Sequence, residues 1–229
     1  MKIFIDSADQ REIQRWLGEG IIDGVTTNPS IMLKDGVYDI EAGAKRLCRL
    51  VGDRPCSIEV TTNDRKQMLE QARVFARWGS NIIVKIPVVN ECGDSCLSVI
   101  NTLTSEGVAV NATAILSFNQ ALLATKAGAT YVSIFAGRVA DEGNDSSQVI
   151  RNVRSWIEDW GYASEIIVGS VRGVIDVQNA ALAGAHIVTI PPQFLPKMID
   201  HKYTRETVAQ FVRDAEKALK EIEEVRLRA

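Results

Sequence analysis

Lys85 is the residue of this sequence whose chemistry is easiest to interpret. It interrupts the apolar run IIVKIPV at positions 82–88, which otherwise has the composition of a buried strand. Burial disfavours the charged form of a lysine, and a neutral amine can attack a carbonyl carbon to form an imine. The alternative is a lysine that extends its ammonium to the solvent and has no chemical role. The first interpretation predicts a Schiff-base nucleophile, and it gains weight if other reactive groups converge on this amine.

Two carboxylates stand where they could move protons for such an amine. Asp6 ends the first apolar run of the chain, and Glu59 lies within the third. Imine formation and carbon–carbon cleavage both need a group that accepts and returns protons. A carboxylate within an apolar strand is costly unless it is paired or used. For Asp6 the alternative is a helix cap, a role that Ser7 or Asp9 can share.

Other polar side chains fall at the ends of further apolar runs. Asn28 lies in the segment TTNPS after the second run, where Pro29 favours an extended backbone before it. Asn111 and Thr113 alternate with apolar residues in the fifth run, so both should face the same side of a strand. Ser133 lies in the sixth run. A turn asparagine and strand hydroxyls are common packing features, so these residues matter only in company with the lysine and the carboxylates.

Two arginines follow the sixth and seventh runs. Arg138 follows the sixth, and Arg172 follows the seventh, with Ser170 close by. Barrel enzymes often bind phosphate near the last strands, where arginine, hydroxyl and backbone amide groups meet. The alternative for each arginine is a salt bridge at the rim. Two arginines and a serine at neighbouring strand ends favour phosphate recognition.

The elements that would position these residues form a repeating pattern. Eight short apolar runs are each followed by a stretch of helical periodicity, and they cover residues 2–6, 22–26, 57–61, 81–86, 108–113, 130–135, 165–170 and 186–190. Several runs are continuous in Ile and Val, as in parallel strands that are buried on both faces. The pattern predicts an α/β fold, a single closed (β/α)8 TIM barrel that takes residues 1–229 as one domain. A barrel brings all its strand ends to one rim, where the reactive residues would meet.

The ends of the predicted helices carry glycines, and the chain ends with a long helical pattern. Left-handed caps are expected at Gly79, Gly128, Gly161 and Gly184. Trp16, Trp78, Trp156 and Trp160 fall on helix patterns and are expected to fill the core. Residues 204–228 carry one apolar stripe, which indicates an additional C-terminal helix. The pattern leaves open whether this helix covers its own barrel or packs on a neighbouring subunit.

Composition and charge exclude several classes of protein. The chain is 46% apolar and 24% charged, as expected of a globular protein with a sizeable core. Its net charge is −3 and its charges are interspersed, so it lacks the basic stripe of a nucleic-acid binder. Its N-terminal run is too short for a signal peptide, and no run approaches the roughly 20 apolar residues of a membrane span. We therefore expect a cytoplasmic protein without nucleic-acid or membrane partners.

The cysteines and histidines do not form a metal-binding pattern. Cys48, Cys56, Cys92 and Cys96 contain no CxxC pair, and the histidines are His186 and His201. We expect reduced thiols, with a disulfide between Cys92 and Cys96 as the alternative. No metal and no organic cofactor are expected.

Six sequence blocks resemble the transaldolase family, in the short-chain subgroup that also contains fructose-6-phosphate aldolase. They are IDSAD (5–9), GVTTNPS (24–30), IIVKIPV (82–88), VNATAILSFNQA (110–121), AGATYVSIFAGRV (127–139) and VGSVRG (168–173). The resemblance runs essentially from end to end of the chain. It implies transfer of a dihydroxyacetone unit in the pentose phosphate pathway, from sedoheptulose 7-phosphate to glyceraldehyde 3-phosphate, giving erythrose 4-phosphate and fructose 6-phosphate. It also implies a homo-oligomer, a pentamer or a decamer.

The same resemblance implies a role for each candidate residue. Lys85 would form the Schiff base, Asp6 would transfer protons, and Glu59 with Thr113 would hold the catalytic water. Asn28, Asn111 and Ser133 would contact the dihydroxyacetone part of the substrate. Arg138, Ser170 and Arg172 would bind its phosphate.

Positions 59 and 135 bear on the choice between transferase and aldolase. The aldolases of the subgroup resemble each other in having Gln and Tyr there, whereas this chain has Glu59 and Phe135. A tyrosine hydroxyl could hold the water that releases the three-carbon fragment, and phenylalanine would leave that fragment waiting for an aldehyde. The pair favours a transaldolase, and an aldolase that releases free dihydroxyacetone is the alternative. Ile134 and Ala140, where the family commonly has a proline and an acid, bear on substrate range.

Two further classes of function fit the same fold. One is a metal-dependent aldolase or a proton-abstracting isomerase. The other is a barrel without catalytic activity that serves binding or assembly. The number of strand ends that carry reactive groups argues against the second class.

Overall fold

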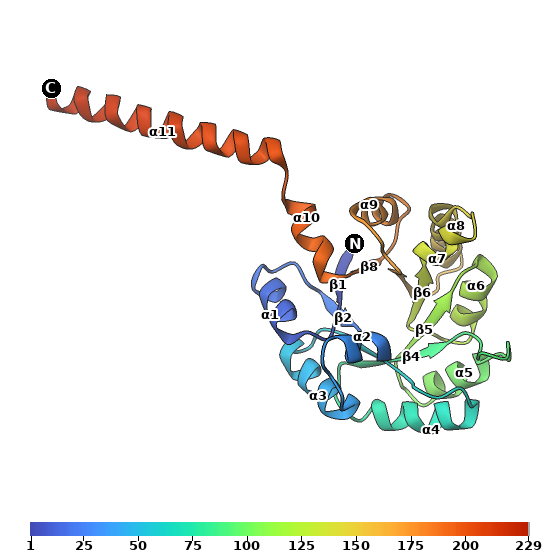
Figure 1. Cartoon of the computed structure of the whole chain (residues 1–229). Helices are drawn as coiled ribbons and strands as arrows, with labels where there is room; N and C mark the ends of the chain where they lie inside the picture. The colour runs from blue at the N-terminus through green and yellow to red at the C-terminus, as the bar shows by residue number, and fades with distance from the viewer. Residues whose placement is uncertain (229) are drawn as a thin grey trace. The chain divides into compact units, whose positions relative to one another are not determined.

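Residues 1–228, which the computed structural model describes, contain a closed barrel of eight parallel strands (Figure 1). The strands are β1 (Lys2–Asp6), β2 (Gly24–Thr26), β3 (Cys56–Glu59), β4 (Ile82–Pro87), β5 (Val110–Ile115), β6 (Tyr131–Phe135), β7 (Glu165–Gly169) and β8 (Ile187–Ile190). Each strand pairs with its neighbours in sequence, and β1 pairs with β8 to close the ring. The predicted (β/α)8 barrel is therefore confirmed.

The strands follow the apolar runs of the sequence to within two residues at either end. Their Ile and Val side chains are buried on both faces of the sheet, since one face fills the barrel and the other lies under the helices. Ile166 and Ile167 in β7, for example, are neighbours whose side chains face opposite sides of the sheet, and both are buried. A polar side chain within such a strand is held in one place by its packed neighbours, which is what a reactive group requires.

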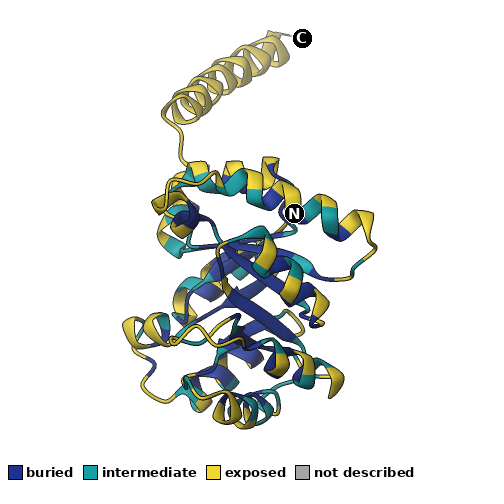
Figure 2. Ribbon diagram, turned by 90° about the vertical axis from the view of Figure 1, so that its right-hand side faces the viewer, coloured by how far each residue is buried: buried dark blue, intermediate teal, exposed yellow. Residues whose placement is uncertain are grey.

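Helices follow the strands and surround the barrel. They are α1 (Gln10–Gly18), α2 (Pro29–Lys34), α3 (Ile40–Val51), α4 (Arg65–Phe75), α5 (Leu97–Ser105), α6 (Phe118–Lys126), α7 (Ala136–Asp141), α8 (Ser146–Asp159) and α9 (Val174–Leu182). Figure 2 shows the strands almost wholly buried, with the surrounding helices buried on one side and exposed on the other. That distribution is the one their amphipathic sequences predict.

Three of the four predicted glycine caps are confirmed. Gly128, Gly161 and Gly184 have φ values of 95°, 66° and 85°, which favour glycine. Gly79 does not adopt a positive φ, so the prediction of a left-handed cap there is wrong. A Cβ at this position would lie 3.2 Å from the Cβ of Cys48. The glycine therefore meets a need for close packing rather than for an unusual backbone conformation.

The tryptophans differ in burial. Trp16 is 2% exposed and fills the space under α1, as predicted. Trp160 is 71% exposed, so its predicted place in the core is wrong. It is the residue that caps the C-terminus of α8, where the helical spacing that would direct a side chain inward no longer holds.

A second compact unit begins at Gln193, after the barrel unit Met1–Pro192. Around and beyond this point the chain forms a 3-10 turn (Pro192–Phe194), α10 (Leu195–Ile199) and α11 (Lys202–Arg228). The helix predicted over residues 204–228 is thus confirmed as α11. None of the residues of α11 is buried, and its apolar side chains include Phe211, 65% exposed, and Leu219, 66% exposed.

Two further features complete the description. No helix within residues 1–228 is both long and apolar enough to cross a membrane. The cysteines are free, with Cys48, Cys56 and Cys96 buried and Cys92 exposed.

Candidate active site

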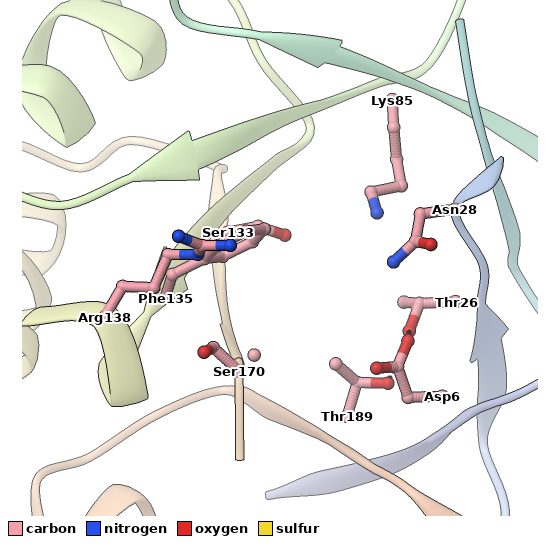
Figure 3. A pocket seen from close by; sticks show the side chains of 10 residues that line it. Asp6, Thr26, Asn28, Lys85, Ser133, Phe135, Arg138, Ser170 and Thr189 are labelled. Carbon is pink, nitrogen blue, oxygen red and sulfur yellow. Dashed lines mark hydrogen bonds between the residues drawn. The ribbon is translucent and has the colours of Figure 1, made fainter. Parts of the chain in front are cut away.

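A polar cavity lies at the carboxyl ends of the barrel strands (Figure 3). Its lining consists of Asp6, Thr26, Asn28, Lys85, Ser133, Phe135, Arg138, Gly169, Ser170 and Thr189. Seven of these residues were candidates on sequence grounds, and they come from elements as distant in sequence as β1 and β7. The rim of the barrel therefore gathers most of the predicted site into one cavity.

Lys85 lies in β4 with its side chain only 6% exposed. Its Nζ is 2.9 Å from Oε2 of Glu59 and donates a hydrogen bond of 2.8 Å to the carbonyl oxygen of Thr27. The register of β3 against β4 places Glu59 directly beside Lys85. Figure 3 shows the amine directed into the cavity, toward Asn28. A buried charge of this kind is tolerable because it has a carboxylate and a carbonyl as partners.

Asp6 ends β1 and faces the same cavity. Its Oδ1 accepts a hydrogen bond of 2.7 Å from the hydroxyl of Thr26, and its other oxygen makes none with residues 1–228. Burial raises the pKa of Asp6, the nearby Lys85 and the Thr26 hydrogen bond lower it, and Glu59 and Asp35 raise it. The result is a carboxyl group with a raised pKa, which makes it a stronger base than an exposed aspartate.

The alternative role for Asp6, a helix cap, is excluded by its neighbours. Asp9 caps α1, with its carboxylate accepting the hydrogen bonds of the first helical amides. Asp35 accepts hydrogen bonds of 2.8 Å from the hydroxyl of Ser7 and from the amide of Ala8. The backbone after β1 is thus satisfied without Asp6, whose side chain is left to the cavity.

Asn28 both starts a helix and lines the cavity. Its Oδ1 accepts a hydrogen bond of 2.8 Å from the amide of Ile31, so it caps α2, and Pro29 occupies the first helical position. This hydrogen bond occupies the side-chain oxygen of Asn28. Figure 3 shows the amide nitrogen directed into the cavity, where it can donate to a ligand.

Asn111 and Ser133 form a buried network beside Lys85. The hydroxyl of Ser133 donates to Oδ1 of Asn111 at 2.7 Å, and Nδ2 of Asn111 is 3.3 Å from Oγ of Ser57. The register of β4 against β5 pairs Asn111 with Lys85. Thr113, two residues further along β5, is 1% exposed, and its hydroxyl makes no hydrogen bond with residues 1–228. Asn111, Thr113 and Glu59 are not among the residues that line the cavity, although Asn111 bonds Ser133 and Glu59 bonds Lys85, which do.

Arg138 and Ser170 line the opposite side of the cavity, and a glycine lets the start of α7 approach the segment that follows β7. A Cβ on Gly137 would lie 2.3 Å from the carbonyl oxygen of Ser170 and 2.8 Å from Nε of Arg172. Such distances are impossible for a real side chain, so only glycine fits here. Ser170 itself has a φ of 58°, an unusual conformation for a serine. The chain therefore has a strained turn at Ser170, on the side of the cavity that Arg138 also lines.

Arg172 lies beside Gly137 but does not line the cavity. Its guanidinium makes a bidentate ion pair with Asp141, with Nη2 2.5 Å from Oδ2. Its backbone amide donates to Asp176, which also receives the amide of Gly173. The rim salt bridge considered for the arginines therefore exists for Arg172, whereas Arg138 forms none with residues 1–228.

The sequence analysis did not single out four residues that belong to this arrangement. Gly169, Thr26 and Thr189 line the cavity, and Asp141 binds Arg172. Thr26 stood at the end of a strand and could have been chosen for that reason. Thr189 lies within an apolar run where threonine is an ordinary strand former, and Asp141 is one of several acids after β6. No pattern in a single sequence distinguishes the last two.

Comparisons with known proteins agree with the geometry. The sequence profile of the transaldolase/fructose-6-phosphate aldolase family matches residues 3–229. The probable transaldolase 2 of Listeria monocytogenes is 42% identical over 216 residues, which cover 94% of this chain and 96% of that protein. The probable transaldolase of Dehalococcoides mccartyi is 38% identical over 214 residues, covering 93% and 97%.

Solved structures with a similar fold are more distant in sequence. A mandelate oxidase with (S)-2-phenylpropionate has a TM-score of 0.59 at 14% identity, covering 84% of this chain and 64% of that one. A thiamine phosphate pyrophosphorylase from Pyrococcus furiosus has a TM-score of 0.57 at 12% identity, covering 83% and 85%. Likeness at this level shows the barrel fold alone.

Proposed function

This chain belongs to the transaldolase/fructose-6-phosphate aldolase family and is an enzyme of the transaldolase type, and on that premise we propose that it transfers a dihydroxyacetone unit between sugar phosphates through an imine at Lys85. The donors would be fructose 6-phosphate and sedoheptulose 7-phosphate, and the acceptors erythrose 4-phosphate and glyceraldehyde 3-phosphate. These substrates belong to the pentose phosphate pathway, and we expect the reaction to take place in the cytoplasm.

The observation that supports this proposal best is the setting of Lys85. Its amine is buried, is directed into the cavity and lies 2.9 Å from the carboxylate of Glu59. A second carboxylate, that of Asp6, lines the same cavity. An enzyme that forms an imine needs an amine that can lose a proton and a nearby group that can take it. Glu59 is the nearest acceptor for that proton.

In the first step, Nζ of Lys85 attacks C2 of the ketose phosphate. The carbonyl oxygen takes up two protons, one from the attacking amine and one that Glu59 has accepted from Lys85, and leaves as water, so the carbon–oxygen double bond is replaced by a protonated carbon–nitrogen double bond. Glu59 and the unpaired hydroxyl of Thr113 are the groups that we propose hold this water. Asn28, Asn111 and Ser133 would orient the hydroxyl groups of the first three carbons.

In the second step, Asp6 removes the proton of the C4 hydroxyl. The C3–C4 bond breaks, its electron pair moves toward the positively charged imine, and an aldose phosphate leaves. The dihydroxyacetone fragment stays on Lys85 as an enamine. The raised pKa of Asp6 suits this step, because the carboxylate must accept a proton from an alcohol and then give it back.

In the third step, the enamine attacks the aldehyde of a second aldose phosphate, and Asp6 returns the proton to the new hydroxyl. Water then hydrolyses the imine and frees Lys85. Phe135 lines the cavity without offering a hydroxyl that could hold an early water. We propose that this delays hydrolysis until an acceptor arrives, which makes the enzyme a transferase.

Phosphate recognition falls to Arg138, Ser170 and Arg172. Arg138 and Ser170 already line the cavity, and Arg172 lies close to Gly137 beside them. Guanidinium groups bind phosphate through charge-assisted hydrogen bonds, often two at a time. For Arg172 this requires that the phosphate replace Asp141 as its partner.

A coupled assay tests the proposal. Purified enzyme with fructose 6-phosphate and erythrose 4-phosphate should produce glyceraldehyde 3-phosphate, and EDTA should not reduce the rate. With fructose 6-phosphate alone, little free dihydroxyacetone should accumulate. Steady release of dihydroxyacetone without an acceptor would make the chain an aldolase instead. Activity that depends on an added metal would contradict the Schiff-base mechanism.

We also propose that the protein forms a homo-oligomer, a pentamer or a decamer, in which α11 packs on a neighbouring subunit. The apolar stripe of α11 supports this, since its side chains are at least half exposed: Val208, Phe211, Val212, Leu219, Ile222 and Val225. Light scattering should give a smaller particle for a chain that ends at Tyr203 than for the full chain. An unchanged mass would show that α11 does not hold subunits together.

A further inference from the structure

The mechanism leaves two polar residues of the cavity, Thr26 and Thr189, without a role. Thr189 in β8 lines the cavity and is 5% exposed. Strand β1 lies between β8 and β2 in the barrel. The register of β1 against β2 pairs Asp6 with Thr26. The hydroxyl of Thr189 reaches across the end of β1 and lies 2.5 Å from the hydroxyl of Thr26. Two threonines and Asp6 thus form a chain at the cavity wall.

The number of hydrogen atoms fixes the direction of this chain. A threonine hydroxyl carries one hydrogen, and an ionised carboxylate can only accept. The hydroxyl of Thr26 therefore donates to Oδ1 of Asp6, at 2.7 Å, and has no hydrogen left. Thr189 must then donate to Thr26. While Asp6 is ionised, the order of donation runs from Thr189 through Thr26 to Asp6.

The chain affects the two oxygens of Asp6 unequally. Oδ1 is occupied by Thr26, whereas Oδ2 makes no hydrogen bond with residues 1–228. A proton taken from a substrate hydroxyl is therefore directed to Oδ2. Donation by Thr189 also polarises the hydroxyl of Thr26 and strengthens its bond to the carboxylate. Without Thr189, Thr26 could rotate and donate to a substrate oxygen in place of Asp6.

The geometry points to a new role: we propose that Thr189 is a positioning residue for proton transfer, acting through Thr26 to hold Oδ1 of Asp6 and leave Oδ2 to the substrate. The proposal rests on the proposed role of Asp6 as the proton-transferring group. It adds a contribution from β8, the strand that supplies no other residue to the reaction.

The charged groups around Asp6 limit the size of the effect. Lys85 on β4 favours the carboxylate, and Glu59 on β3 and Asp35 after α2 disfavour it. Arg138 also faces the cavity from the side of β6. None of them bonds to Thr189, so a change at Thr189 leaves these charges in place. Loss of the Thr189 hydroxyl should therefore shift the pH at which Asp6 takes up its proton, while Asp6 still titrates.

The test is the pH dependence of kcat/KM, which reports groups of the free enzyme. The wild type should lose activity at low pH as Asp6 becomes protonated. In Thr26→Val the midpoint of this loss should move up by about 1–2 pH units, because a hydrogen bond to a charged group is lost. In Thr189→Val it should move in the same direction by roughly 0.3–0.5 units. Thr189→Ser, which keeps the hydroxyl, should restore the wild-type profile.

Thr125→Val is the matched control, because Thr125 is a buried threonine whose hydroxyl makes no hydrogen bond with residues 1–228. It should have the wild-type profile. If Thr189→Val does not fold, Thr189→Ala removes the same hydroxyl without adding a methyl group. A Thr189→Val or Thr189→Ala profile that superimposes on that of Thr125→Val would overturn the proposal, as would a Thr189→Ser profile shifted as far as that of Thr189→Val.

Asp6→Asn separates this outcome from a failure of the proposed function. If Asp6→Asn keeps high activity and the low-pH loss, Asp6 does not transfer the proton and the proposed mechanism fails. If Asp6→Asn abolishes the activity but Thr189→Val keeps the wild-type pH profile, the mechanism stands and the role of Thr189 is refuted.

Discussion

Two ion pairs beside the cavity have similar geometry and differ in their surroundings. Lys85 and Glu59 meet inside the barrel, with side chains that are 6% and 25% exposed. Arg172 and Asp141 meet at the rim, with side chains that are 56% and 47% exposed. The first pair lies next to Asp6 and the hydroxyl chain, and the second lies next to Arg138 and Ser170. Under the proposed mechanism, the chemical steps and the recognition of phosphate would therefore take place at different depths of one site.

The difference in burial decides what each pair can do. Removing one partner of a buried pair leaves an uncompensated charge, at a cost of about 3–5 kcal/mol. An exposed pair contributes little to stability, so it can exchange partners at little cost. Lys85 is therefore held in one geometry. If Arg172 binds phosphate as proposed, it can leave Asp141 at little cost.

The largest effect is expected from the buried pair. Lys85→Met should lower kcat on the order of 10⁴-fold or more, because the nucleophile is lost and no other lysine lines the cavity within residues 1–228. Coupled-assay kinetics would measure this. Lys45→Met, which removes an exposed lysine from its pair with Glu41, should keep wild-type activity. Comparable losses in both variants would mean that burial does not distinguish a reactive lysine here.

Asp6→Asn should have the next largest effect on activity. Loss of the proton-transferring group should lower kcat about 10²- to 10⁴-fold. Asp9→Asn is the control, because asparagine caps a helix about as well as aspartate. Near-equal activity of the two variants would remove Asp6 from the reaction.

The stability of Asp6→Asn should change in the opposite direction. Burial raises the pKa of Asp6, so the folded state binds this proton more tightly than the unfolded state, whose pKa is near 3.9. The contribution of Asp6 to stability is therefore greatest below that value and falls as pH rises through the raised pKa. At neutral pH the variant should melt higher than the wild type, by about 2–4 °C for each kcal/mol, and the difference should shrink toward pH 4. A lower Tm at neutral pH would contradict this account.

Arg138→Met tests the recognition half of the cavity. The variant loses charge-assisted hydrogen bonds to phosphate, so kcat/KM for fructose 6-phosphate should fall about 10- to 100-fold. The rate with unphosphorylated fructose, though slow, should not change, and Arg138→Lys should recover part of the loss. An equal loss with both donors would indicate a role for Arg138 in the chemical steps.

Asp141→Asn should have the smallest effect, and an unusual sign. Removing the carboxylate that competes for Arg172 should lower KM for fructose 6-phosphate, by about two- to fivefold, because the exposed pair is weak. Glu142→Gln is the matched control, since it removes one exposed negative charge next to Asp141 and forms no ion pair within residues 1–228. A raised KM in Asp141→Asn would mean that Asp141 orients Arg172 for phosphate rather than competing with it.

The contrast between buried and exposed polar residues also explains what the sequence could predict. Buried polar residues are visible in a sequence when they interrupt apolar runs, as Lys85 does, because few other reasons place a lysine there. The barrel itself follows from those runs, since eight stretches rich in Ile and Val cannot all be buried in a simpler way. The strands, three of the four glycine caps and most of the cavity lining were therefore accessible from the sequence.

Partners and close approaches were not accessible in this way. Thr189 is an ordinary strand residue until its hydroxyl is seen 2.5 Å from that of Thr26. Asp141 has no distinguishing neighbour in the sequence, and only the structure joins it to Arg172. Gly79 followed the rule for a helix end but serves close packing instead. Each case depends on a contact between residues of different elements, and a single sequence does not encode such contacts as a local pattern.

The most direct test of the account is reduction of the enzyme with borohydride in the presence of fructose 6-phosphate, followed by peptide mass mapping. We expect one adduct, a reduced dihydroxyacetone or hexose phosphate group, on the peptide that contains Lys85, and no adduct in Lys85→Met. An adduct on another lysine, or full catalytic turnover with no trapped adduct, would contradict the claim that this buried amine bonds to the substrate.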